Sequence, residues 1–103
     1  MKRPLASITL LISALSLLSG TAYAADPNLG RNLAATCAAC HGTDGRTVGI
    51  NANLAGVPKD TLVQTLRAFK SGEKPATVMN QLAKGYDDAQ IEAIAGYLAA
   101  QRK

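Results

Sequence analysis

Five consecutive residues in the first half of the chain have the types and spacing needed to bind a porphyrin. Cys37 and Cys40 are separated by two alanines, and His41 follows directly. Two thiols at this spacing can add across the two vinyl groups of one porphyrin. The histidine then lies under the ring, where an imidazole nitrogen can bind the iron. This is the pattern of c-type haem attachment, and it predicts one covalently bound haem c per chain with His41 as the proximal iron ligand.

A Cys-x-x-Cys pair has two other common roles. A redox-active disulfide is expected in a βαβ context, and the sequence shows no strand pattern. A structural zinc site needs four ligands, whereas the chain offers two cysteines and one histidine. Each alternative lacks a required part, so haem attachment is the favoured interpretation.

Met79 is the candidate for the second axial ligand of the iron. This is the only methionine after Met1, and no second histidine exists. A thioether ligand raises the reduction potential of haem iron. The alternative is a methionine that fills a gap in the core. Met79 falls outside the expected helical stripes, in a loop between two helices, and we therefore predict it as the distal iron ligand.

Three main helices are expected to position these residues. Asp26 and Pro27 are suited to the first two positions of a helix that should end around the cysteines. A second helix is indicated from about 59 to 71, where Leu62, Leu66 and Phe69 share one face and Gly72 is a C-terminal stop.

The last helix carries the clearest signals. Asp87 followed by Gln90 resembles a capping box. An apolar stripe follows, formed by Ile91, Ile94, Ala95 and Leu98, and the helix should end near residues 101–103. Residues 41–58 and 73–77 are expected to be loops. Loops this long are unusual in a small domain, unless they wrap a ligand. The fold class is therefore all-α, with three main helices and long loops around one haem.

Residues 1–24 have the pattern of a signal peptide. Lys2 and Arg3 precede an apolar run over 5–18, and Ala22-Tyr23-Ala24 supplies a small-residue cleavage site. The alternative is a membrane anchor, but spanning a bilayer takes about 20 residues. We expect cleavage before Ala25, a mature domain over 25–103, a periplasmic location and no stable membrane insertion.

Charge excludes a nucleic-acid-binding role. Without Lys2 and Arg3, nine basic residues face seven acidic ones, a net charge of +2. No cluster of lysines and arginines forms a phosphate-binding track. A domain this small usually needs a disulfide, a metal or a cofactor for stability, which agrees with a haem.

Residues 26–101 resemble the class I c-type cytochromes. The shared features are the motif 37–41, the loop Leu54-Ala55-Gly56, Met79 and the terminal helix containing Tyr97. The resemblance implies a haem held between His41 and Met79, with the first and last helices crossing beside it. Gly30 and Tyr97 are the counterparts of the close contact at that crossing.

One position departs from the family pattern. Where members commonly have a proline whose carbonyl accepts a hydrogen bond from the ligand histidine, this chain has Ala52. The carbonyl is retained, but the fixed φ of proline is lost. The resemblance therefore leaves open how the imidazole of His41 is oriented.

The resemblance implies a one-electron carrier and not an enzyme. Residues 69–79 and 83–86 also resemble the cytochrome subunit of flavocytochrome c sulfide dehydrogenases. An alternative is therefore the haem subunit of such a dehydrogenase, and a third is a haem sensor or peroxidase-like enzyme. The expected partners are redox proteins, such as a flavoprotein dehydrogenase subunit or a terminal oxidase. Two interpretations apply to Lys59, Arg67, Lys70, Lys74 and Lys84: a basic rim for an acidic partner, or ordinary solvated surface charges, and the second is favoured for any single residue.

Overall fold

A computed structural model describes residues 26–103, and every regular element in that range is helical. The predicted signal peptide therefore lies outside the described residues. The elements are α1 (Leu29–Ala34), the 3₁₀ helix η1 (Ala35–Cys37), α2 (Ala38–His41), the 3₁₀ helix η2 (Thr43–Gly45), α3 (Lys59–Ser71), α4 (Met79–Ala83) and α5 (Asp88–Ala99). The predicted all-α class is confirmed. None of the described helices has the length and apolar character needed to cross a membrane.

The first helical stretch runs from Leu29 to the haem-attachment motif. It starts two residues later than predicted, because Asp26 caps a turn and not the helix itself. The Asp26 carboxylate accepts a hydrogen bond from the Asn28 N–H at 2.8 Å, and the Asp26 carbonyl accepts one from Leu29 at 3.2 Å. Helical turns then continue through η1 and α2. The stretch ends at Gly42, whose φ of 83° is favourable only for glycine.

The helix predicted over 59–71 is confirmed as α3. Gly72 follows it in the left-handed conformation with φ 86°, and its N–H donates to the Phe69 carbonyl at 3.3 Å. The loop expected over 73–77 is present and extends to residue 78, because α4 begins at Met79. Met79 is therefore the first residue of a short helix and not part of a loop. Five residues are too few to display a helical period, and this explains the error.

The terminal helix α5 begins with the predicted capping box. The Gln90 N–H donates to the Asp87 carboxylate at 2.8 Å, and the Asp87 N–H donates to the Gln90 side-chain oxygen at 2.9 Å. Ile91, Ile94 and Leu98 on its inner face are at most 2% exposed. Burying each such side chain contributes about 1.5–3 kcal/mol, so α5 is the centre of the core.

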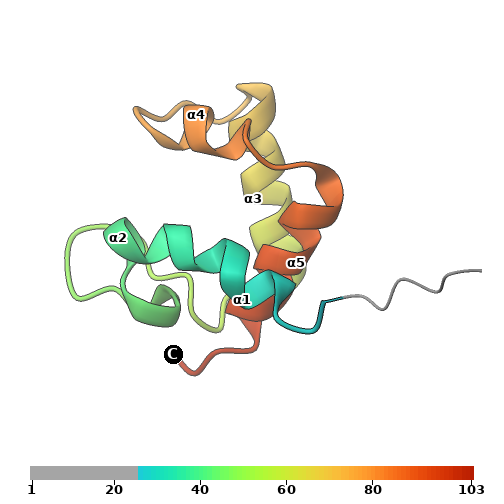
Figure 1. Ribbon diagram of the computed structural model, residues 1–103. Helices are drawn as coiled ribbons and strands as arrows, with labels where there is room; N and C mark the ends of the chain where they lie inside the picture. The colour runs from blue at the N-terminus through green and yellow to red at the C-terminus, as the bar shows by residue number, and fades with distance from the viewer. Residues whose placement is uncertain (1–25) are drawn as a thin grey trace, which may run out of the picture.

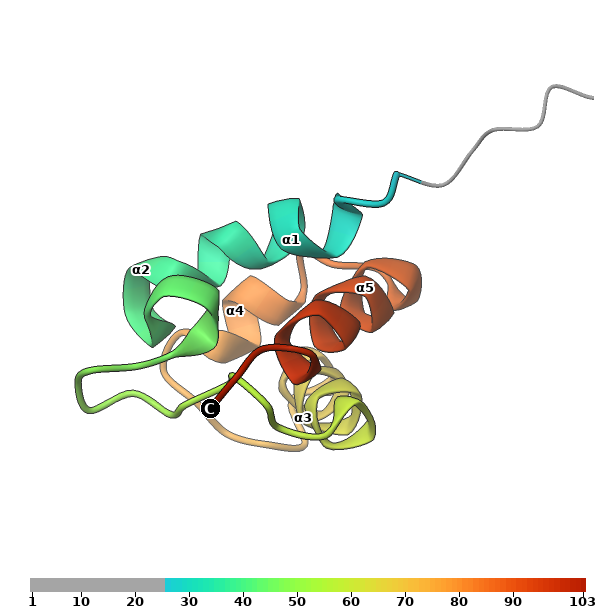
Figure 2. The same ribbon diagram turned by 90° about the horizontal axis from the view of Figure 1, so that it is seen from below.

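The helices α3 and α5 pack against each other, and α1 crosses α5 (Figure 1; Figure 2). The short helix α4 packs on α3. Figure 1 shows α2 and α4 projecting to the same side of the α3–α5 pair. The buried core cluster comprises Ala34, Leu62, Val63, Ile91, Ile94, Ala95 and Leu98. The core is therefore a thin layer along α5, with α2 and α4 extending beyond it.

Gly30 allows the close crossing of α1 and α5. A Cβ atom placed on Gly30 would collide with the Ala93 carbonyl oxygen and would lie 3.0 Å from the Tyr97 Cβ. A backbone carbonyl inside a helix cannot move aside as a flexible side chain can. The predicted contact between Gly30 and Tyr97 is present, and glycine is needed there for space.

Candidate haem-binding site

One apolar cavity of about 370 Å³ brings together the four residues predicted to hold the haem. Cys37, Cys40 and His41 reach it from η1 and α2, and Met79 reaches it from α4. These are the two parts that project to one side of the α3–α5 pair (Figure 1). The apolar part of the wall includes Leu54, Leu62, Leu66, Phe69, Ile94 and Leu98. Apolar walls, two thiols and an imidazole are the donor set and surroundings that a covalently attached haem requires.

Cys37 and Cys40 do not form a disulfide with each other. Burial raises the pKa of the Cys37 thiol, and a hydrogen bond with Thr36 opposes that shift without cancelling it. Reactive cysteines of Cys-x-x-Cys redox proteins have lowered pKa values, because the attacking species is the thiolate. The surroundings of Cys37 therefore do not match a redox-active disulfide.

A zinc site finds no support among the described residues. No group of three or more histidine, cysteine, aspartate and glutamate side chains within 26–103 lies close enough together to hold a metal ion. Structural zinc needs four protein ligands. The two cysteines and His41 instead face the shared apolar cavity.

His41 is oriented by the loop that follows it. Its Nδ1 lies 2.7 Å from the Ala52 carbonyl oxygen. A carbonyl can only accept, so Nδ1 carries the hydrogen and Nε2 keeps its lone pair. A ring nitrogen with a lone pair is what a metal requires. The Ala52 carbonyl thus accepts the hydrogen bond for which the family resemblance implies a proline carbonyl as acceptor.

Met79 is half-buried and has a polar neighbour that fixes its helix. The Asn80 amide nitrogen donates to the Phe69 carbonyl at 2.9 Å and to the Lys74 carbonyl at 2.8 Å. The Asn80 side-chain oxygen accepts from the Ala76 N–H at 2.8 Å. Asn80 therefore joins the end of α3, the following loop and the start of α4. Sequence reasoning missed it, because a single asparagine inside an unrecognised helix gives no pattern.

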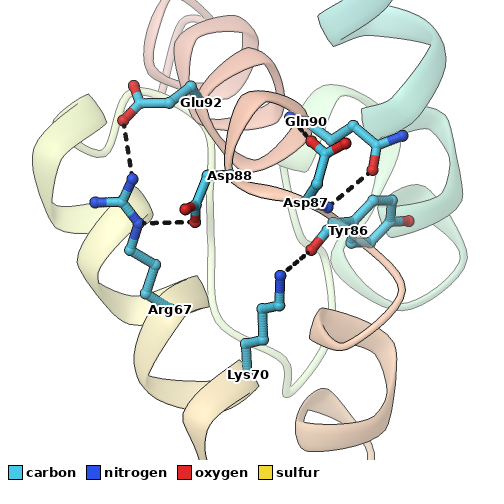
Figure 3. Close-up of polar contacts among 7 residues, drawn as sticks. All are labelled: Arg67, Lys70, Tyr86, Asp87, Asp88, Gln90 and Glu92. Carbon is cyan, nitrogen blue, oxygen red and sulfur yellow. Dashed lines mark hydrogen bonds and ion pairs between the residues drawn. The ribbon is translucent and has the colours of Figure 1, made fainter.

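Tyr86 connects the haem-attachment segment to the turn before α5. Its hydroxyl lies 2.7 Å from the Thr36 hydroxyl. Its carbonyl accepts a hydrogen bond from Lys70 Nζ at 2.6 Å (Figure 3). Both Tyr86 and Thr36 line the cavity. The tyrosine was recognised in the sequence as part of a family segment, but its partners, 50 and 16 residues away, leave no local signal.

Tyr97 joins α5 to the turn that follows the motif. Its hydroxyl donates to the Asp44 carboxylate. This bond, together with burial, raises the pKa of the Tyr97 hydroxyl above its ordinary value. Asp44 has a φ of 54°, a left-handed conformation that asparagine and aspartate adopt more readily than most residues. The aspartate thus provides both the turn and the acceptor.

Two of the five cations considered for a basic rim pair with carboxylates instead. Lys59 pairs with Glu92 at 3.0 Å. Arg67 pairs with Asp88 at 3.4 Å and with Glu92 at 3.6 Å (Figure 3). These charges join α3 to α5, because the polar face of α3 lies beside the carboxylates at the start of α5.

The remaining three lysines have different surroundings. Lys70 is committed to the Tyr86 carbonyl. Lys74 lines the cavity, with its Nζ 5.2 Å from the centre of the Phe69 ring, a distance at which a cation interacts with an aromatic face. Lys84 is exposed. Only Lys74 of the five is thus placed at the cavity.

Comparison with known proteins identifies the family of the chain. The sequence model of the cytochrome c family matches residues 28–101. Cytochrome c-554(548) of Halomonas halodenitrificans is 35% identical over 82 residues, which cover 76% of this chain and 99% of that protein. The cytochrome subunit of sulfide dehydrogenase from Chlorobaculum tepidum is 38% identical over 68 residues, or 66% of this chain and 62% of that protein. The thiosulfate dehydrogenase electron acceptor of Thiomonas intermedia is 39% identical over 66 residues, 62% of this chain and 30% of that protein.

The chain belongs to the cytochrome c family. The proteins of this family are small electron carriers with covalently attached haem c. The matched regions cover unequal parts of the relatives: nearly all of the Halomonas protein, but 62% of the Chlorobaculum subunit and 28% of a cytochrome c-552 of Acidithiobacillus ferridurans. Two of the relatives are named for a sulfide dehydrogenase and a thiosulfate dehydrogenase.

Proposed function

We propose that the protein is a periplasmic one-electron carrier whose single haem is bound by Cys37 and Cys40 and ligated by His41 and Met79. One observation carries the proposal: all four side chains line the same apolar cavity, although Met79 lies 38 positions after His41. When bound, haem c supplies an iron centre that alternates between the ferric and ferrous states. The chain's own residues decide how that centre is held and what reaches it.

His41 and Met79 approach the cavity from two different walls, α2 and α4. With both as ligands, no open coordination position is left for a substrate. The hydrogen bond from His41 to the Ala52 carbonyl keeps the imidazole in the tautomer that can bind a metal. The apolar walls keep water away from the site. This arrangement suits electron transfer and does not suit catalysis at the iron.

The coordination can be tested on the purified haem-loaded protein. We expect a low-spin spectrum with the weak red absorption band of methionine-ligated ferric haem. The haem should stay attached to the denatured chain, because the thioether bonds to Cys37 and Cys40 are covalent. Rapid binding of carbon monoxide by the reduced protein at neutral pH would contradict the carrier and favour a haem sensor or a peroxidase-like enzyme.

A second candidate is the haem subunit of a sulfide-oxidising dehydrogenase. It is favoured by the resemblance of residues 69–79 and 83–86 and by the Chlorobaculum relative, which is named as such a subunit. In that role the partner's flavin would react with sulfide and this chain would accept electrons. Purification from a membrane-free native extract separates the two candidates, because a subunit should co-elute with a flavoprotein and a free carrier should not.

The periplasmic location depends on export directed by residues 1–24, and release from the membrane depends on their removal. The charged start, the apolar run and the cleavage pattern at Ala22-Tyr23-Ala24 support it. The intact mass of the native protein tests it: we expect a chain that starts at Ala25 and carries one haem. A native chain that still begins at Met1 would contradict cleavage.

A further inference from the structure

The loop after the haem-attachment motif is held by side chains and not by its backbone. The Arg46 N–H donates to the Thr43 carbonyl, and the Leu54 and Ala55 N–H groups donate to the Gly45 carbonyl. Within residues 26–103, no backbone–backbone hydrogen bond involves residues 47–53. Val48 and Ile50 at the tip of this loop are fully exposed. The conformation of residues 47–53 must therefore be fixed by other contacts.

Two neighbouring hydrogen bonds connect this loop to the motif. The Asn51 amide nitrogen donates to the Cys40 carbonyl at 2.7 Å, and His41 Nδ1 donates to the Ala52 carbonyl at 2.7 Å. Each bond joins residues 11 apart in sequence. The Cys40 carbonyl is available because the last carbonyls of a helix have no partner within it. Residues 40–41 and 51–52 are thus paired side by side.

Ala52 needs such a support. A proline at this position would fix φ by its ring, whereas alanine leaves the peptide free to turn. A rotated peptide would carry the Ala52 carbonyl away from His41. Asn51 immediately precedes Ala52, lines the same cavity and donates to the Cys40 carbonyl, next to His41.

We propose that Asn51 is a positioning residue for the iron ligand His41. By holding the Cys40 carbonyl, its amide keeps the Ala52 carbonyl in place to accept the Nδ1 hydrogen. It does for this chain what a proline ring does in other family members. The inference rests on the proposed function, since it takes His41 as the iron ligand.

The reduction potential reports this role. A firm hydrogen bond at Nδ1 makes the imidazole a stronger donor, which favours ferric iron. Loss of Asn51 should weaken that bond, disfavour ferric iron and raise the potential. Removing a hydrogen-bond partner of a ligand typically changes metal-site properties about 10-fold or more. Asn51 acts on His41 only through the Ala52 carbonyl. We therefore expect the equilibrium constant between ferric and ferrous iron to change by up to about 10-fold, which shifts the midpoint potential by about 59 mV for one electron.

The test compares three variants of the haem-loaded protein. Asn51→Ala should raise the midpoint potential and speed hydrogen exchange at His41 Nδ1 in the reduced protein, as seen by NMR. The control is Asn53→Ala, since the Asn53 amide donates only to the nearby Ala55 carbonyl at 2.9 Å; both properties should stay unchanged. Asn51→Ala combined with Ala52→Pro should restore the wild-type values, because the ring then fixes the peptide. The Ala52 N–H makes no backbone hydrogen bond that proline would remove.

The outcomes separate this inference from the proposed function. The wild-type spectrum is measured first, and absence of histidine–methionine coordination there would reject the function before any variant is compared. With that coordination present, the positioning role is overturned if Asn51→Ala behaves like Asn53→Ala. It is also overturned if Ala52→Pro fails to restore the potential. Thermal unfolding followed by circular dichroism identifies any variant whose potential shifts only because the fold is lost.

Discussion

The two proposed axial ligands are held in different ways. The His41 ring has a hydrogen-bond partner of its own, the Ala52 carbonyl. Among residues 26–103 the Met79 sulfur has no such partner, and the position of Met79 is set through its backbone by Asn80. An imidazole has a second nitrogen that can be used for orientation, whereas a thioether has only its weakly accepting sulfur. A histidine ligand can therefore be held directly by a hydrogen bond to its ring, whereas a methionine ligand is positioned only through its backbone segment.

The two sides also depend on different helices. The segment of His41 is fixed to α5 through the crossing at Gly30 and through the bond from Tyr97 to Asp44. The segment of Met79 is fixed to the end of α3 through Asn80. Substitutions that weaken α5 should therefore affect the segment of His41 first. Substitutions at the end of α3 should affect the segment of Met79.

The largest expected effects come from removing the ligands themselves. His41→Ala should abolish a stable six-coordinate haem. Met79→Ala should leave covalent attachment intact and lower the potential by on the order of 0.1–0.4 V, a fraction of the roughly 0.8 V that axial ligands span. Absorption spectra and redox titration measure both. An unchanged potential in Met79→Ala would remove this residue from the site.

The anchor of the histidine side can be broken at Gly30. Gly30→Ala should destabilise the protein by about 1–3 kcal/mol, because the new methyl group meets the Ala93 carbonyl. The control is Gly96→Ala in α5, whose Cβ would lie 3.8 Å from the flexible end of Lys59. That variant should gain up to about 1 kcal/mol from helix propensity. Denaturant unfolding measures the change in the free energy of unfolding of both variants. A change of the same sign in both would contradict the role of Gly30 in the crossing.

The methionine side should weaken when Asn80 is replaced. Asn80→Ala removes three hydrogen bonds and should cost about 1–2 kcal/mol at the Met79 segment. Added imidazole should then displace Met79 at roughly 5- to 30-fold lower concentration, since 1.4 kcal/mol is a factor of ten. Gln81→Ala, an exposed neighbour, is the control. Displacement at the same concentration in both variants would show that Asn80 does not hold the ligand.

The smallest effect is a pH dependence on the histidine side. The bond to Asp44 raises the pKa of Tyr97 above its ordinary value of 10.0. A group with a raised pKa in the folded state stabilises the fold below its unfolded pKa, and this contribution is lost as pH rises through the folded pKa. Tyr97→Phe should cost about 0.5–1.5 kcal/mol near pH 8. Above pH 10 the free energy of unfolding of the wild type should fall towards that of Tyr97→Phe. A difference between the two proteins that stays constant from pH 8 to above pH 10 would show that ionisation of Tyr97 does not contribute.

Sequence reasoning was sound where signals are local. The 59–71 helix, the Asp87 capping box and the Gly72 stop each depend on residues within a few positions of one another. The short helix α4 was missed because five residues show no period. The sequence left open whether the five cations form a basic rim, because lysines and arginines look alike in sequence, whether they face solvent or the carboxylates of a neighbouring helix.

The site residues also differ in whether a local signal marks them. A fixed spacing marked the cysteines and His41, and Met79 was found as the remaining donor; the structure places all four at one cavity. Asn51 and Asn80 could not be found this way. Each acts through a backbone carbonyl whose direction is set only when distant segments come together, and asparagine is common in ordinary loops.

The crossing at Gly30 also has a consequence for the order in which the domain can form. It joins the first and last helices of the described chain, so the wall contributed by Ile94 and Leu98 is the last part of the cavity to be synthesised. Contacts between such distant segments form slowly compared with local ones. A nascent chain that ends before α5 would already contain both cysteines, His41 and Met79, yet it would have no enclosed place for a porphyrin.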